Sequence, residues 1–191
     1  MLLDEYKCLN VVTQEGPYRA MEVALRSGDI DFIIGAVRPI DEPRDITTEI
    51  LFEDKLSVIA RASHPLMDSK NLSLSDLAEC GWVLPELHTP SGKLFVDIMT
   101  KHNLPMPKHA IYTSSLSMVR GLLMGSDRVA LLSEHQIHYD KTFNLLSVLP
   151  VDVIDTYRPI GITLRRQTKP SLAAQLFLDK LRQVAESVGD H

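Results

Sequence analysis

The chain has 191 residues, of which 45% are hydrophobic and 24% are charged, a composition typical of a globular protein. Its 20 basic and 25 acidic side chains leave a formal net charge of −5, which argues against nucleic-acid binding by these residues alone, because neutralising phosphates requires a basic surface. Cys8 and Cys80 lie far apart and argue against a disulfide framework. No apolar run approaches the length of a membrane span and no signal peptide is evident, so we expect a cytoplasmic protein.

The first residues are typical of a chain that opens inside a secondary-structure element. Leu2, Leu3 and Tyr6 have the spacing of the last turn of a helix that began earlier, which suggests a fragment of a longer protein. Residues 9–13 follow with a pattern rich in β-branched side chains and predict a strand.

A βαβ unit is expected over the first 35 residues. The strand at 9–13 is followed by a helix, marked by Tyr18 and Leu25 at helical spacing and ended by Gly28. The apolar run at 30–34 then predicts a buried strand. Parallel strands joined in this way imply an α/β sheet.

The rest of the chain continues to alternate between strand and helix patterns. Strands are predicted over 46–52, 56–60, 81–84, 110–113, 129–132, 145–149 and 157–164, and helices over 72–78, 91–102, 134–139 and 171–188, with a further helix opened by Ser114 and Ser115 and ended by Gly125. Residues 24–35 and 122–133 share the same pattern: a helix end, a glycine, an aspartate and then a short strand. One explanation is that any βαβ protein repeats such a pattern. The other is that the chain forms two similar lobes that face each other across a crevice, where small molecules bind at the carboxyl ends of strands.

The motifs of common enzymes are missing. The sequence has no glycine-rich nucleotide loop, no serine-hydrolase elbow and no zinc-protease motif. Ser114 and Ser115 stand before a helix, where capping is the simpler interpretation. His135 and His138 could face one metal ion, but no third ligand is evident. We therefore expect no catalytic residue, no metal and no cofactor.

Two predicted strand-to-helix turns carry small polar side chains. Residues 88–92 precede one helix and residues 113–115 precede another. Unpaired N–H groups and the positive end of the helix dipole suit such turns to a carboxylate or a phosphate, although plain helix capping explains either turn alone. Both turns follow strands of the same candidate lobe, so we expect them to meet at one rim.

Five segments together carry a family resemblance. Residues 24–35 form a helix end with a glycine, followed by an aspartate-led strand that ends in Ile-Gly. Residues 51–60 are followed by His-Pro-Leu at 64–66 and by Leu-Ser-Asp-Leu at 74–77, and residues 119–133 contain a glycine and then a Leu-Leu pair. In this order and spacing they resemble the effector-binding domain of LysR-type transcriptional regulators, over nearly the whole chain.

The resemblance implies a type 2 periplasmic-binding-protein-like fold, in which two Rossmann-like α/β subdomains are joined by two crossover strands. Subdomain I would comprise 1–59 and 161–191, without the family's first strand, and subdomain II would comprise 60–160. A small effector, often a carboxylate-bearing metabolite, would bind between the subdomains of a homodimer or tetramer. Promoter DNA would be contacted only by an N-terminal winged helix-turn-helix outside this sequence, and no membrane contact is implied.

The resemblance also implies an effector site with residues from both subdomains. These residues would be Ala36, Val37, Arg38, Thr89, Ser91, Thr113, Ser114, Ser115, Leu132 and Ser133, with Arg38 as a candidate anion partner. The sequence departs from the family near Ser133, where proline is usual, and at Asp127 or Arg128, which replaces a glycine. In the family, the first strand and the turn after it supply a principal polar contact to the effector, and the resemblance implies that this sequence lacks them.

Two other functions remain open from the sequence. A solute-binding protein of the same fold is disfavoured by the internal start and the lack of a signal peptide. A small α/β enzyme using Ser115 or His135 is disfavoured because no nucleophile–base spacing is present. The apolar face of Tyr18, Met21 and Leu25 fits either the core or a subunit interface, and the family resemblance favours the interface.

Overall fold

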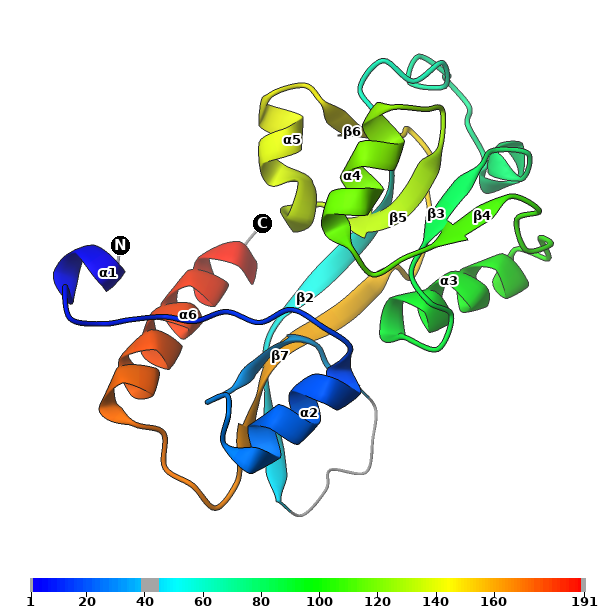
Figure 1. Ribbon diagram of the computed structural model, residues 1–191. Helices are drawn as coiled ribbons and strands as arrows, with labels where there is room; N and C mark the ends of the chain where they lie inside the picture. Colours follow the sequence, from blue (N-terminus) through cyan, green and yellow to red (C-terminus); the bar gives the residue numbers. More distant parts are fainter. Residues whose placement is uncertain (1, 39–44, 190–191) are drawn as a thin grey trace. The chain divides into compact units, whose positions relative to one another are not determined.

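The computed structural model describes residues 2–38 and 45–189 and is a mixed α/β structure (Figure 1). Its contacts divide the chain into unit 1, Met1–Glu53 with Pro159–His191, and unit 2, Asp54–Arg158. The chain passes from unit 1 into unit 2 within strand β2 (Ile46–Arg61) and returns within strand β7 (Tyr157–Arg165). Two crossover strands therefore connect the units, and the expected boundaries after residues 59 and 160 lie within these same strands.

Unit 1 is built on a small antiparallel arrangement. Strand β1 (Ile33–Ala36) pairs antiparallel with β7, so that Ile34 stands opposite Ile162. The first half of β2 lies beside β7, where the hydroxyl oxygens of Thr48 and Thr163 are 3.4 Å apart. The helices of this unit are α1 (Leu2–Glu5), α2 (Tyr18–Ser27) and α6 (Leu172–Gly189).

Specific side chains tie the helices of unit 1 to its strands. The guanidinium of Arg165 in β7 donates to the carbonyl oxygens of Leu25 and Ile30, at 2.5 and 2.8 Å, which satisfies backbone groups near the end of α2. The ring of Phe32 lies 5.7 Å from that of Phe177 in α6. Leu25 is fully buried, so this position of the α2 apolar face belongs to the core of unit 1.

Unit 2 contains a sheet of mixed direction. Its strands are the second half of β2, β3 (Trp82–Leu84), β4 (Ala110–Tyr112), β5 (Val129–Ser133) and β6 (Leu146–Val148). Strand β3 pairs parallel with β4 and β5, whereas β2 pairs antiparallel with β5 and β6. The carboxyl ends of β3, β4 and β5 therefore lie at one edge, where the turns to the following helices begin.

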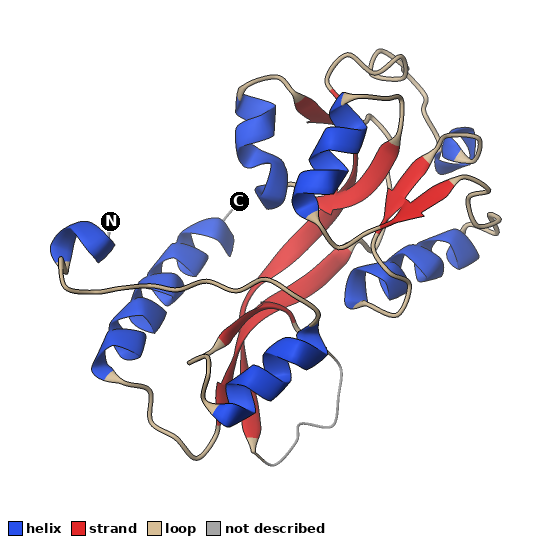
Figure 2. Ribbon diagram, in the orientation of Figure 1, coloured by secondary structure: helices blue, strands red, loops and turns tan. Residues whose placement is uncertain are grey.

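Helices cover both faces of the unit 2 sheet, because alternate strand residues point to opposite sides (Figure 2). Val58 packs in a core cluster with Phe95 of helix α3, while its neighbour Ile59 packs in a second cluster with Leu123 of helix α4. The helical elements of this unit are η1 (Leu74–Leu77), α3 (Pro90–Lys101), α4 (Leu116–Met124), η2 (His135–Ile137) and α5 (His138–Thr142). This two-sided burial explains the nearly continuous apolar runs of these strands.

The amino-terminal βαβ prediction is wrong. Residues 9–13 form no strand, and Val12 is 86% exposed. Strand β1 begins at Ile33 rather than at residue 30 and pairs antiparallel, not parallel. The physical reason is that a β-branched sequence becomes a strand only when a neighbouring strand satisfies its backbone groups, and the described residues provide none beside 9–13.

The two strands predicted over 46–52 and 56–60 are one continuous strand, β2. The charged residues between the two predicted strands suggest a loop, but they continue the strand. Their side chains still point alternately to its two faces, since Glu53 and Lys55 are exposed and Asp54 between them is buried. The other predicted strands are confirmed, as are the helices at 91–102, 114–125 and 171–188, with small differences at their ends. The helix predicted over 72–78 is only the 3-10 turn η1 (Leu74–Leu77), and the one predicted over 134–139 begins as the 3-10 turn η2 (His135–Ile137). Helix α2 ends as predicted at Gly28, whose φ of 86° is left-handed.

Candidate functional site

A buried ion pair joins the two crossover strands at the edge of unit 2. The Nε and Nη2 atoms of Arg158 in β7 donate to Oδ2 of Asp54 in β2, at 3.0 and 2.8 Å. The side chains are 17% and 3% exposed, respectively. A carboxylate so deeply buried requires a partner, because an unpaired charge is costly away from water, and Arg158 provides it with a forked contact.

Two of the predicted site residues are hydrogen-bonded to this ion pair. Nη1 of Arg158 donates to the hydroxyl oxygen of Ser91, in the first turn of α3. The hydroxyl of Ser133, the last residue of β5, donates to Oδ1 of Asp54 at 2.5 Å and accepts the backbone N–H of His135 at 3.2 Å. Ser91 is half-buried, whereas Ser133 is only 2% exposed. We call these four residues, Ser91, Arg158, Asp54 and Ser133, the unit 2 polar cluster.

The turn before α3 holds Ser91 in place. Thr89 is the N-cap: its hydroxyl accepts the N–H of Gly92 at 3.2 Å and donates to the carbonyl oxygen of Glu86 at 2.7 Å. A Cβ added to Gly92 would overlap that same carbonyl oxygen and come within 2.6 Å of Cα of Leu87. Glycine is therefore required here by the close approach of the preceding turn.

The turn before α4 is confirmed as a helix cap. The hydroxyl of Ser115 accepts the N–H of Met118 at 3.3 Å, and the hydroxyl of Thr113 accepts the N–H of Ser115 at 3.1 Å. Ser114 and Ser115 are exposed and Thr113 is half-buried. These residues share unit 2 with the polar cluster, at the carboxyl ends of neighbouring parallel strands.

A second polar contact lies just beyond Ser133. Glu134 accepts from the hydroxyl of Ser57 and pairs with Lys141, both at 2.8 Å. Burial acts to raise the pKa of Glu134, but the hydrogen bonds from Lys141 and Ser57 outweigh it and hold the pKa below its usual range. The Glu134 carboxylate is therefore charged, and its hydrogen-bond partners both belong to unit 2.

The three remaining candidates belong to unit 1. The N–H of Val37, which follows Ala36, donates to the carbonyl oxygen of Pro159 at 2.8 Å. The guanidinium of Arg38 lies 4.1 Å from the centroid of the Tyr18 ring, and within the described part of the chain its Nε is buried without a hydrogen-bond acceptor. Burial lowers the pKa of Arg38.

The expected site thus divides between the units. Seven of its ten residues lie in unit 2, and among these the structure connects Ser91 and Ser133 through one ion pair; Leu132 packs against the core cluster that contains α4. Ala36, Val37 and Arg38 lie in unit 1. That all ten bind one effector stays a prediction.

Asp54 and Arg158 are not among the site residues predicted from the sequence. They are 104 residues apart, so nothing in the spacing connects them. A signal was nevertheless present, because Asp54 occupies the inward-pointing position of a strand between two charged residues. An acidic side chain on the buried face of a strand indicates a buried cation or hydroxyl nearby.

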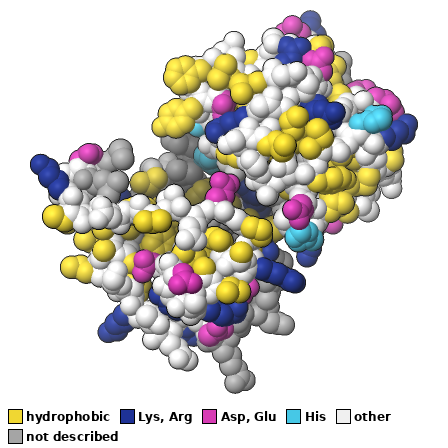
Figure 3. All heavy atoms as spheres, viewed as in Figure 1, with side chains coloured by type: hydrophobic (Ala, Val, Ile, Leu, Met, Phe, Trp, Pro, Cys, Tyr) yellow, Lys and Arg dark blue, Asp and Glu magenta, His cyan; other side chains and the backbone are white. Residues whose placement is uncertain are grey.

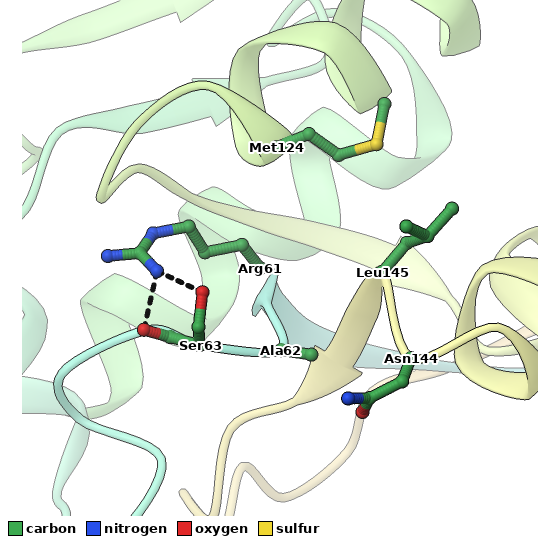
Figure 4. Close-up of a pocket in the computed structure, with 6 residues that line it drawn as sticks. All are labelled: Arg61, Ala62, Ser63, Met124, Asn144 and Leu145. Atoms are coloured by element: carbon green, nitrogen blue, oxygen red, sulfur yellow. Dashed lines mark hydrogen bonds between the residues drawn. The ribbon is translucent and has the colours of Figure 1, made fainter.

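A cavity of about 300 Å³ lies elsewhere in unit 2 (Figure 4). It is lined by Arg61, Ala62, Ser63, Met124, Asn144 and Leu145. The guanidinium of Arg61 is already engaged there by Asp127, at 2.6 Å, and by the hydroxyl and carbonyl oxygens of Ser63. None of the predicted site residues lines this cavity, so it is not the candidate site.

Two further features are defined for the described residues only. Over 2–38 and 45–189, no group of three or more His, Cys, Asp or Glu side chains is placed to hold a metal ion. Within the same ranges, no helix has both the length and the apolar character needed to cross a membrane. The space-filling view shows charged side chains of both signs interspersed over the visible face (Figure 3).

Comparisons with known proteins agree on one family. The family model described as the LysR substrate binding domain matches residues 1–186. The chain is 35% identical over 176 residues to the HTH-type transcriptional regulator GalR of Pseudomonas putida, covering 92% of this chain and 44% of that protein. It is 30% identical over 167 residues to the regulator PcaQ of Agrobacterium fabrum, covering 87% and 53%. The chain therefore spans about half the length of the curated relatives it matches.

Solved structures give the same fold. The BenM effector binding domain with its effector benzoate is 26% identical, with a TM-score of 0.71 over 98% of this chain and 84% of that one. The Synechocystis CcmR regulatory domain in complex with 2-PG is 19% identical, with a TM-score of 0.75 over 96% and 87%, and shows the fold alone. The type 2 periplasmic-binding-protein-like fold with two crossover strands is thereby confirmed.

Proposed function

We propose that this chain, which belongs to the LysR substrate binding domain family, is the effector-sensing and oligomerisation domain of a LysR-type transcriptional regulator. Its effector is a small metabolite with a carboxylate group. Promoter DNA is contacted by an N-terminal winged helix-turn-helix of the parent protein, in keeping with the net charge of −5 on this chain. The parent protein acts in the cytoplasm as a homodimer or a larger oligomer.

The observation that carries this proposal is the unit 2 polar cluster. A half-buried hydroxyl, that of Ser91, is held in the first turn of a helix by the half-buried guanidinium of Arg158. Hydroxyls and helix N–H groups are what a small carboxylate needs for recognition, and a neighbouring fixed cation favours its negative charge. The related BenM domain has benzoate as its effector, which supports a ligand of this class.

Binding acts as a switch by shifting a population of domain arrangements. An effector favours one arrangement only by the difference between its affinities for the two, and the same difference sets how strongly it changes DNA binding. The half-buried Tyr18 and Met21 on α2 are the proposed subunit-contact positions, whereas the neighbouring Leu25 is fully buried in unit 1.

The direct test is a thermal-unfolding screen of the 191-residue chain with small carboxylic acids, including benzoate, and with neutral sugars. A ligand present at 100 times its dissociation constant adds about 2.7 kcal/mol to stability, which is readily measured as a rise in the unfolding midpoint. We expect at least one acid, and none of the sugars, to raise it. A screen in which no acid raises the midpoint overturns the proposal.

A second test uses the parent regulator and a promoter reporter. Ser115→Phe fills the exposed turn before α4 and is expected to abolish the effector response without unfolding the domain. Thr100→Phe, on an exposed position of the last turn of α3, is the matched control and keeps the response. A normal response from Ser115→Phe removes this turn from the site.

A further inference from the structure

We propose that the Asp54–Arg158 ion pair is a positioning element that sets Ser91 as a hydrogen-bond donor, so that this pair gives the effector site its preference for a carboxylate over a neutral group. This inference rests on the proposed function above and names the side chains that determine its ligand class. Arg158 and Asp54 act through Ser91 and do not themselves touch the effector.

The hydrogen-bond donors and acceptors of the polar cluster support the positioning role of the ion pair. An arginine has donors and no acceptor, so the oxygen of Ser91 must accept from Nη1 of Arg158. The hydroxyl hydrogen of Ser91 is then left to donate outward, and its half-buried side chain is within reach of a ligand. An anionic oxygen is the best acceptor for a donor backed by a cation.

Ser133 is used in the opposite way. Its hydrogen is given to Asp54 and its oxygen accepts the N–H of His135, so it has no donor left. It is also only 2% exposed. The cluster therefore presents one available hydroxyl donor, that of Ser91, and Ser133 serves to anchor Asp54.

The fork of Arg158 is essential to this arrangement. Two of its nitrogen atoms, Nε and Nη2, bind one oxygen of Asp54 and thereby fix the guanidinium plane, which leaves Nη1 directed at Ser91. A lysine ammonium is a point charge on a flexible stem and has no such plane. Arg158→Lys thus keeps the positive charge but releases the Ser91 hydroxyl.

The chain contains a matched control for the variants. Arg61 makes the same kind of contacts, with the carboxylate of Asp127 and the hydroxyl of Ser63, elsewhere in unit 2 and away from the predicted site. Arg61→Lys therefore removes an equivalent fork without changing Ser91.

The experiment measures dissociation constants of the 191-residue chain by NMR titration for benzoate and benzamide, which differ in charge but hardly in shape. The acid that most raises the unfolding midpoint in the screen is titrated in parallel with its own primary amide. We expect Ser91→Ala and Arg158→Lys each to weaken acid binding about tenfold, since a hydrogen bond to a charged group is lost. The effect on amide binding should be clearly smaller, because the amide oxygen is a neutral acceptor, so the preference for the acid falls. The double variant is expected to be no weaker than either single variant, because both remove one and the same contact.

Two other outcomes would contradict the positioning role or the proposed function. If Arg158→Lys retains the wild-type preference for acid over amide, or if the two single effects add, the positioning role is overturned while effector binding stands. If the wild-type chain binds no acid, the proposed function itself fails. Ser91→Ala replaces a half-buried hydroxyl and serves as a second variant should Arg158→Lys not fold, because an unchanged acid preference in Ser91→Ala also overturns the positioning role.

Discussion

Arg158→Met should destabilise unit 2 strongly, because it leaves the Asp54 carboxylate buried without its cation. Removing one partner of a buried ion pair costs about 3–5 kcal/mol, and since the Arg158 side chain keeps 17% exposure we expect the lower end, about 3 kcal/mol. With a typical urea m value of about 2 kcal/mol per molar, the unfolding midpoint falls by about 1.5 M. The double variant Asp54→Asn/Arg158→Met should recover part of this loss, since it no longer contains a buried unpaired charge.

The assay for this prediction is urea unfolding followed by tryptophan fluorescence. Trp82 is the only tryptophan of the chain and is buried in the core of unit 2, so it reports on the unit that contains the ion pair. Arg61→Met is the control: the Arg61 and Asp127 side chains are 26% and 61% exposed, and the loss should stay below about 1 kcal/mol. If Arg158→Met shifts the midpoint no more than Arg61→Met does, the Asp54–Arg158 contact is not the buried, stabilising pair that the structure indicates.

Four further predictions address packing and reactivity. Gly92→Ala should destabilise the chain by about 1–3 kcal/mol through overlap with the preceding turn. Gly121→Ala, where an added Cβ meets open space within α4, should instead stabilise the chain by about 0.5–1 kcal/mol. If the urea midpoints of Gly92→Ala and Gly121→Ala shift in the same direction, this reasoning is contradicted. Leu123→Ala should cost about 2–5 kcal/mol by the same assay because this side chain is fully buried, and a loss under about 1 kcal/mol would place it outside the core. Burial raises the pKa of the Cys80 thiol, so iodoacetamide at pH 8 should modify the exposed Cys8 first, as followed by peptide mass spectrometry; faster modification of Cys80 would refute this.

Local patterns predict most of the helices and strands because the information that specifies them is local. Gly28 ends α2 in a left-handed conformation, and Ser115 caps α4, as their residue types indicate. The strand predicted at 9–13 fails for the opposite reason. Its β-branched residues favour an extended chain, but pairing depends on a neighbouring strand that the local sequence cannot reveal.

The site shows the same division between local and distant information. Thr89 and Ser91 could be found from sequence because helix starts have recognisable small polar residues. Arg158 could not, since its partner Asp54 lies 104 residues away and only the pairing of the folded strands brings the two together. A charged residue on the inward face of a predicted strand, as at Asp54, is the one sign that such a partner exists.

The most direct measurement of the central claim is a backbone ¹H–¹⁵N NMR titration of the 191-residue chain with benzoate. We expect the largest chemical-shift changes at Ser91, Gly92 and the other residues of the turn before α3, and much smaller changes with benzamide at the same concentration. Changes centred instead on the cavity beside Arg61, or equal changes with benzamide, would contradict the claim that unit 2 recognises a carboxylate through the Ser91 hydroxyl.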